Sequence, residues 1–381
     1  MGQAVDGLSG EDALRQARIF LGPLPPKGIK REEQARTLID LVLGAIEDGQ
    51  LRPCVFSDYR PPGDPEARER GRDWVAVQAL VAADSVVQEG KAIPFLQNLI
   101  LDAYEPRTRM EAILEVIPLG NQPAIVQALV GALRDGKTAG IQVPNFTEQP
   151  TVGEVAACAL VEIGDANGLR EMVRLAVFWD KRLGEFLPFY TRDELIKAAD
   201  EVALDALIEV LRGDLPDQPW LHERPAHIIE KVEGDARSVA ASLLAEMAGK
   251  DAAGVLTSAL DPQKPIRGII KALGTLGAPH AIARIAGVME RGGPEEFSCR
   301  NSIEAIVKEA KNLTSDDRAD IGKQLIGMVE SESVKVRALG VEQLGKLGYM
   351  PATEALDKAL SDPESKVRKA AKKAAKQIAH Q

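Results

Sequence analysis

A short motif returns along the last third of the chain and restricts the kinds of fold that this sequence can adopt. The pattern Asp-Pro-x-x-x-Ile/Val-Arg occurs at 261–267 and at 362–368 with identical spacing. Arg300 and Arg337 stand at the same place in two further copies, so the four arginines follow one another at intervals of 33, 37 and 31 residues. A period of this length is typical of one helical hairpin per repeat.

The residues around each arginine predict where the helices begin and end. An Asp at the N-cap accepts hydrogen bonds from unpaired backbone N–H groups, and a Pro at the first helical position loses no donor that the helix needs. The pattern Leu-Gly-x-Leu-Gly follows at 273–277 and 344–348, and the segment 159–165 closes in a similar way. Because glycine readily enters the left-handed conformation, each of these segments predicts a helix end.

Neither helix of such a hairpin can bury its apolar stripe alone, so hairpins must stack and share one continuous core. Hydrophobic residues make up 45% of the chain and aromatic residues only 4%, as expected for helices that pack through Ala, Leu, Ile and Val. The sequence therefore predicts an all-α fold, an α-solenoid of stacked helical hairpins that forms an armadillo-type superhelix.

These motifs resemble HEAT repeats, in particular the bacterial HEAT-like repeats of the phycobilisome-lyase type. The resemblance is good over 234–381 and looser over 72–213, and it implies a repeat solenoid over 72–381. Residues 1–71 depart from the pattern, because Pro-rich segments at 22–26 and 60–65 leave a single convincing helix at 32–46. We expect this part to be an atypical N-terminal cap.

Three long insertions interrupt the repeats near 135–151, 179–192 and 213–225. In the predicted register each follows a second helix and precedes a first helix. Turns of one class emerge on one edge of a solenoid, so the insertions should form a single ridge beside the concave surface.

Aromatic and basic residues gather in two of these insertions and are the candidate partner-binding site. Arginines and large aromatic side chains are typical of interaction hot spots. Long insertions also pack their own aromatic side chains back onto the solenoid, and the sequence favours this self-packing over a partner site. The candidate residues are Trp179, Lys181, Arg182, Phe186, Tyr190, Arg192 and Trp220.

The stretch 366–376 carries six basic residues, in a chain whose net charge is −10. Such a helix can bind phosphates or an acidic membrane surface. Val367, Ala371, Ala374 and Ile378 nevertheless form a narrow apolar stripe suited to packing on the previous repeat. The sequence favours a terminal cap whose lysines face solvent.

Motifs for catalysis, metals or cofactors are missing. The closest histidines, His222 and His227, have no recognised ligand spacing, and Cys158 lies in an apolar run where a thiol serves packing. We expect no catalytic, cofactor-binding or metal-binding residues. The odd number of cysteines favours a reducing compartment, and neither a signal peptide nor a transmembrane span is apparent. We therefore expect a cytoplasmic protein. The alternative that a signal peptide has already been removed stays open.

Together these features favour a non-enzymatic scaffold or adaptor that binds a partner protein through its concave face and insertion ridge. The resemblance leaves a second possibility, a bilin-lyase-like chaperone or lyase for a chromophore. Helical-repeat deoxyhypusine hydroxylases need several His-Glu pairs, and this chain has only His222-Glu223. The acidic balance argues against a nucleic-acid-binding protein like the HEAT-like DNA glycosylases, and we expect no small-molecule substrate.

Overall fold

Helices make up nearly all regular structure in the part of the chain that the computed structural model describes, namely residues 10–22, 30–53, 65–120, 122–138, 150–178, 188–198, 200–214 and 225–379. The one β feature among these residues is an isolated antiparallel bridge between Thr138 and Thr151. The all-α fold predicted from the repeats is thus confirmed. The chain divides near residue 199 into two compact units.

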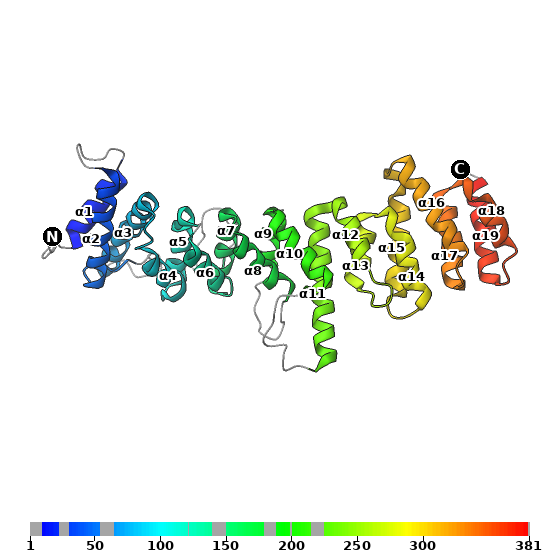
Figure 1. The fold of residues 1–381 in the computed structure, drawn as a ribbon, viewed down its shortest axis with the longest axis horizontal. Helices are drawn as coiled ribbons and strands as arrows, with labels where there is room; N and C mark the ends of the chain where they lie inside the picture. Colours follow the sequence, from blue (N-terminus) through cyan, green and yellow to red (C-terminus); the bar gives the residue numbers. More distant parts are fainter. Residues whose placement is uncertain are drawn as a thin grey trace. The chain divides into compact units, whose positions relative to one another are not determined.

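The N-terminal unit is a stack of helices in two layers. Its helices are α1 (Gly10–Leu21), α2 (Arg31–Glu47), α3 (Pro65–Val87), α4 (Ile93–Asp102), α5 (Pro106–Glu115), η1 (Ile117–Leu119), α6 (Pro123–Ala132), α7 (Val152–Ile163), α8 (Ala166–Val177) and α9 (Pro188–Ala198). Helices α1, α3, α5, α7 and α9 pack on one another in that order, and α4 packs on α6 in the other layer. Figure 1 shows these helices following one another in chain order.

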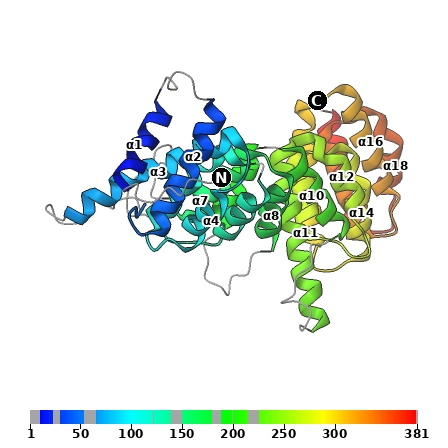
Figure 2. The ribbon, with the colours of Figure 1, turned by 60° about the vertical axis from the view of Figure 1, so that its left-hand side comes forward.

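The C-terminal unit repeats this arrangement. Its helices are α10 (Glu201–Arg212), α11 (Ala226–Ala248), η4 (Gly249–Asp251), α12 (Ala252–Ala259), α13 (Arg267–Leu276), η5 (Pro279–Ala281), α14 (Ile282–Arg291), α15 (Glu296–Glu309), η6 (Ala310–Asn312), α16 (Ser315–Val329), α17 (Val334–Leu347), η7 (Met350–Ala352), α18 (Thr353–Leu360) and α19 (Ser365–Ala379). Helices α11, α13, α15, α17 and α19 form one layer by successive contacts. The second helices of the hairpins, α12, α14, α16 and α18, lie on one side of this unit (Figure 2).

The predicted helix ends are present. Gly164, Gly277 and Gly348 follow α7, α13 and α17 with φ angles of 67°, 63° and 67°, in the left-handed region that favours glycine. The predicted apolar stripe of α19 is also in place, because Val367, Ala371 and Ala374 are buried. These residues bury the last helix against α17 and α18.

The prediction for the Asp-Pro motif was wrong about the helix start. Helix α13 begins at Arg267, five residues after Pro262, and α19 begins at Ser365, two residues after Pro363. The carboxylates of Asp261 and Asp362 instead accept a hydrogen bond from the backbone N–H two residues later, at 2.8 Å in both cases. This is an Asx turn, in which the side chain satisfies the loop rather than the helix.

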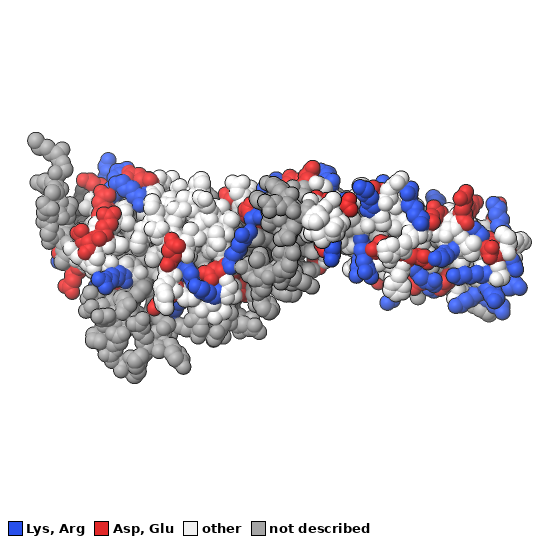
Figure 3. Space-filling model, turned by 90° about the horizontal axis from the view of Figure 1, so that it is seen from below, with Lys and Arg blue, Asp and Glu red and all other residues white. Residues whose placement is uncertain are grey.

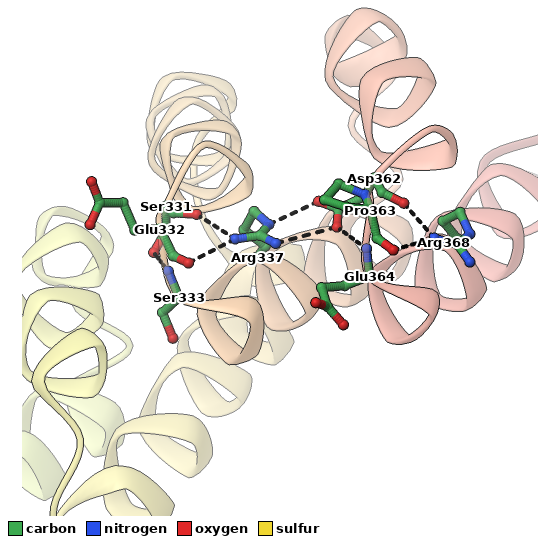
Figure 4. A network of polar contacts seen from close by, with 8 residues as sticks. All are labelled: Ser331, Glu332, Ser333, Arg337, Asp362, Pro363, Glu364 and Arg368. Carbon is green, nitrogen blue, oxygen red and sulfur yellow. Dashed lines mark hydrogen bonds and ion pairs between the residues drawn. The ribbon is translucent and has the colours of Figure 1, made fainter.

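The motif arginine completes this loop (Figure 4). Nη1 of Arg368 donates to the carbonyl oxygens of Asp362 and Pro363, both at 2.6 Å. Nη1 of Arg337 donates in the same way to Ser331 and Glu332, at 3.0 and 2.9 Å. The last two motif arginines therefore hold the loop before their own helix in the same way, whereas Arg267 donates to Ser298 and Arg300 pairs with glutamates.

The first 71 residues contain more helix than the sequence predicts. The expected helix at 32–46 is present as α2, and α1 and the start of α3 are additional. Helix α1 buries Ala13, Leu14, Ala17 and Phe20 and packs on α2 and α3. Pro65 begins α3 without breaking it, because a proline at the first helical position removes no intrahelical hydrogen bond.

Candidate functional site

The candidate residues from the insertions cannot be placed as a group. Tyr190 and Arg192 lie at the beginning of α9, in the part of that helix where only the backbone is described. The remaining candidates, Trp179, Lys181, Arg182, Phe186 and Trp220, lie outside the described residues. The ridge therefore stays a prediction, and the described residues direct attention to the C-terminal unit.

Helices α15, α17 and α19 lie side by side and expose a common face, which we call the three-helix face. Each is the first helix of its hairpin. Helices α15 and α19 keep much of their surface accessible, whereas α17 between them is mostly buried but exposes Lys335 and Lys346. Two hollows run across this face, one toward the beginnings of the three helices and one toward their ends. Figure 3 shows Lys and Arg side chains concentrated at the end of the molecule that α17 and α19 form.

The first hollow has a volume of about 490 Å³ and is lined by an exposed aromatic side chain among cations. Phe297 on α15 is 69% exposed, although large apolar side chains are usually covered. Arg300, Lys335 and Lys366 line the same hollow, one from each helix. An accessible ring beside an arginine is the combination that protein-binding hot spots favour.

Ion pairs neutralise the acidic residues of the three-helix face. Arg300 lies 3.0 Å from both Glu304 and Glu342, and Lys346 lies 3.0 Å from Glu342. Burial by itself raises the pKa of Glu342, but the hydrogen bond and charge of Lys346, together with Arg300 and Lys373, hold that pKa below its ordinary value. Glu342 is thus ionised, both glutamates are paired, and the positive charge in excess belongs to the other lysines.

The second hollow, which we call the lysine groove, has a volume of about 850 Å³ and is lined by four lysines and one glutamate. The lysines are Lys308 on α15, Lys346 on α17, and Lys373 and Lys376 on α19. Lys308, Lys373 and Lys376 form no ion pair with any residue in the described ranges. The groove therefore presents unpaired positive charge, although the chain as a whole carries a net charge of −10.

Gln343 on α17 also lines the lysine groove, and it is unusual. The side chain is fully buried, and neither Nε2 nor Oε1 makes a hydrogen bond within the structure. Buried polar groups are nearly always paired, so an amide with no partner calls for an explanation.

The lysine groove suits an anionic ligand. Its volume is within the range of small-molecule sites, and Ala305, Val307 and Gly345 supply an apolar lining between the ammonium groups. Ammonium groups bind carboxylates and phosphates as strong charge-assisted hydrogen-bond donors.

Sequence reasoning singled out Lys373 and Lys376 but missed the groove, because it considered α19 alone. The available signal was a lysine near the end of three successive first helices, since Lys308, Lys346 and Lys376 fall eight or nine residues after Arg300, Arg337 and Arg368. The signal for Gln343 was its place in the repeat, six residues after Arg337, where the other copies have apolar residues.

The described thiols are poor nucleophiles. Burial, followed by the nearby charge of Glu194, raises the pKa of Cys158 to about 12. Burial, followed by the charge of Glu295, likewise raises the pKa of Cys299 to about 12. Among the residues that the structure describes, we find no group of His, Cys, Asp and Glu side chains that could hold a metal ion, and no helix long and apolar enough to cross a membrane.

Comparison with known proteins gives a consistent set of partial matches. The chain is 30% identical over 172 residues to the phycocyanobilin lyase subunit alpha of Picosynechococcus sp., covering 45% of this chain and 59% of that protein. It is also 30% identical to the protein of the same name from Thermosynechococcus vestitus, with coverage of 42% and 54%, and to that from Microchaete diplosiphon, with coverage of 32% and 41%. The chain thus spans about half the length of the curated relatives it matches.

No family model matches the chain. Among solved structures, an engineered protein is 15% identical with a TM-score of 0.28, covering 97% of this chain and 99% of that one. Human deoxyhypusine hydroxylase in complex with glycerol is 16% identical with a TM-score of 0.28, covering 78% and 99%.

Proposed function

We propose that this chain binds an open-chain tetrapyrrole of the phycocyanobilin type and presents it to a protein partner. The observation that carries the proposal is the lysine groove, where Lys308, Lys373 and Lys376 form no direct ion pair with a carboxylate among the described residues. Relatives named phycocyanobilin lyase subunit alpha support this choice among anionic ligands. The proposal departs from the sequence-based expectation that no small molecule binds.

The chemistry of the pigment fits the groove. Phycocyanobilin carries two propionate side chains on a largely apolar chain of four rings, so it offers two carboxylates to lysines and flat carbon surface to the apolar lining. Ala305 and Val307 and the aliphatic stems of the lysines can contact the rings. The chain's acidic balance does not oppose this, because the acidic residues of the face are already paired.

The test is a titration with phycocyanobilin, followed by its visible absorption. We expect saturable binding to the full chain, weakened at least about ten-fold in Lys308→Gln/Lys373→Gln/Lys376→Gln, because three modest charge interactions are lost together. The matched control is Lys250→Gln/Lys264→Gln/Lys323→Gln, which removes the same charge from exposed lysines of the same unit outside the groove.

Two results would contradict the proposal. Absence of saturable binding to the wild-type chain would exclude a bilin-binding function. Equal weakening in the groove variant and the control variant would show that only overall charge attracts the pigment.

Binding of a protein partner is the second candidate function, and the exposed ring of Phe297 favours it. A photo-crosslinking residue at 297 should capture one partner, whereas the same residue at the more accessible Tyr104, which is 96% exposed in the other unit, should not. The insertion ridge predicts a further effect. Trp179→Ala/Phe186→Ala/Tyr190→Ala/Trp220→Ala should lose a partner that the wild-type chain recovers in a crosslinking pull-down, and an unchanged set of partners would leave those aromatics to pack on the protein itself.

A further inference from the structure

Gln343 occupies a core position of its repeat. It lies six residues after the motif Arg337, and the residues six after Arg267, Arg300 and Arg368 are Leu273, Ile306 and Ala374. All three are apolar and buried. Aligning the Leu-Gly-x-Leu-Gly endings instead pairs Gln343 with Ala272, which is also apolar and buried. The repeat pattern therefore calls for an apolar side chain where this chain has an amide.

An amide in this place lowers stability rather than raising it. Nε2 and Oε1 of Gln343 lose their hydrogen bonds to water on folding and gain none within the structure. Replacing such a group by an apolar one of the same shape is neutral or stabilising, because nothing is left unpaired. Gln343 thus has no role in folding that methionine could not perform.

We infer that Gln343 recognises the ligand of the lysine groove, pairing its amide with the lactam N–H and C=O at one end of an open-chain tetrapyrrole. The inference rests on the proposed function and assigns a specificity-determining residue to that site. The amide offers one donor and one acceptor side by side, and a lactam edge offers the complementary pair. Lys308, Lys373 and Lys376 line the same groove as Gln343 and take the propionates, and the buried amide becomes accessible to the pigment when the side chains that cover it move aside.

Carboxylates alone do not explain the buried amide. Lysines at the surface of the groove can bind an anion without any contribution from its floor, whereas a desolvated amide discriminates between ligands that pair with it and ligands that do not. The lysines explain why an anion is attracted to the groove, and Gln343 explains which anionic ligands are selected.

The experiment compares Gln343→Met with Gln324→Met in the full chain. Methionine has nearly the shape of glutamine and carries no strong donor or acceptor. Gln324 on α16 is the matched control, because its amide is paired: Nε2 donates to the carbonyl of Pro279 at 2.9 Å and to Asp320 at 2.6 Å, and Oε1 accepts from the N–H of Ala283 at 2.9 Å. Thermal unfolding and phycocyanobilin affinity are measured for wild type and both variants.

We expect the two variants to differ in both measurements, the unfolding temperature and the affinity for phycocyanobilin. Gln343→Met should keep or raise the unfolding temperature while weakening phycocyanobilin binding at least about ten-fold, the loss of about one desolvated hydrogen-bonded pair. Gln324→Met should lower the unfolding temperature and leave binding within about two-fold. With the dimethyl ester of phycocyanobilin as the probe, overall affinity should fall and the factor caused by Gln343→Met should persist, because the lactam is unchanged.

Each of the other possible results would reject one particular part of the inference. A lower unfolding temperature for Gln343→Met would show that the amide serves the fold. A stable variant with unchanged phycocyanobilin affinity would remove Gln343 from recognition while the proposed function stands. Failure of the wild-type chain to bind phycocyanobilin would reject the proposed function itself, and with it the assignment of Gln343 to that pigment.

Discussion

Arg337 joins two consecutive hairpins through Asp362, with its Nε atom 2.8 Å from Oδ2 and its Nη2 atom 3.3 Å from Oδ1. The two side chains are only 14% and 10% exposed. The same guanidinium holds two carbonyl oxygens of its own loop, so one side chain fixes the loop before α17 and the loop before α19 (Figure 4). Arg109 and Asp135 make a corresponding link at 3.1 Å in the N-terminal unit.

Arg337→Met should therefore destabilise the C-terminal unit by about 3 kcal/mol, because it leaves Asp362 and two carbonyl groups unpaired in a largely buried place. The measurement is urea denaturation of the full chain followed by circular dichroism. Lys358→Met is the control: its contacts with Glu330 and Glu354 are 3.9 and 3.8 Å long and well exposed, so its cost should stay below about 0.5 kcal/mol. Equal costs would show that the Arg337 link adds nothing beyond a surface ion pair.

The same link predicts how stability depends on pH. The hydrogen bond from Arg337 outweighs burial and, with the backbone N–H of Glu364 and the charge of Arg368, holds the pKa of Asp362 below its ordinary value. A lowered folded-state pKa contributes stability above the unfolded pKa, near 3.9, and that contribution is lost as pH falls through the folded value. The difference in unfolding free energy between wild type and Arg337→Met should thus be largest near neutral pH and shrink below about pH 4. A difference that is constant between about pH 7 and pH 3 would contradict this role for Asp362.

The repeat could be predicted from sequence because its signals are local. Gly277 and Gly348 end their helices for reasons of backbone conformation alone, and the arginine spacing reports the length of a hairpin. The role of Asp362 was misassigned because a carboxylate can satisfy either a helix start or a turn, and the choice depends on Arg337 from the preceding hairpin.

The candidate site was less predictable because it is made by helices far apart in sequence. Lys308 and Lys376 line one groove only because α15, α17 and α19 stand side by side. The burial of Gln343 likewise depends on its neighbours rather than on its own helix. The insertion aromatics attracted attention through their local density, and the described residues neither support nor contradict their role.

Close packing between repeats predicts that a glycine-to-alanine substitution lowers stability at one glycine and raises it at another. A Cβ added at Gly268 on α13 would lie 2.4 Å from Cα of Ser238, whereas one added at Gly254 on α12 would have no neighbour within 4 Å. Gly268→Ala must therefore push α13 away from α11 and should cost about 2 kcal/mol or more. Gly254→Ala should stabilise by about 0.5–1 kcal/mol, because alanine loses less backbone entropy in a helix. Thermal unfolding of the two variants checks the signs, and a stable Gly268→Ala variant would mean that these helices do not approach so closely.

The buried thiols give the last prediction, which concerns reactivity. Only the thiolate attacks a disulfide reagent, and the pKa of both Cys158 and Cys299 is raised to about 12, with burial as the main cause. At pH 8 about one thiol in ten thousand would then be ionised, against about one in four at the ordinary pKa. In a Cys54→Ser background, which removes the third cysteine, the folded chain should show almost no reaction with dithiobis(nitrobenzoate) over minutes at pH 8. Both thiols should react at once in guanidinium, because unfolding restores water to the sulfur atoms and so lowers the pKa.

Rapid reaction of one thiol in the folded chain would contradict this prediction. Labelling each single-cysteine variant would then show which repeat opens, since Cys158 lies on α7 and Cys299 on α15.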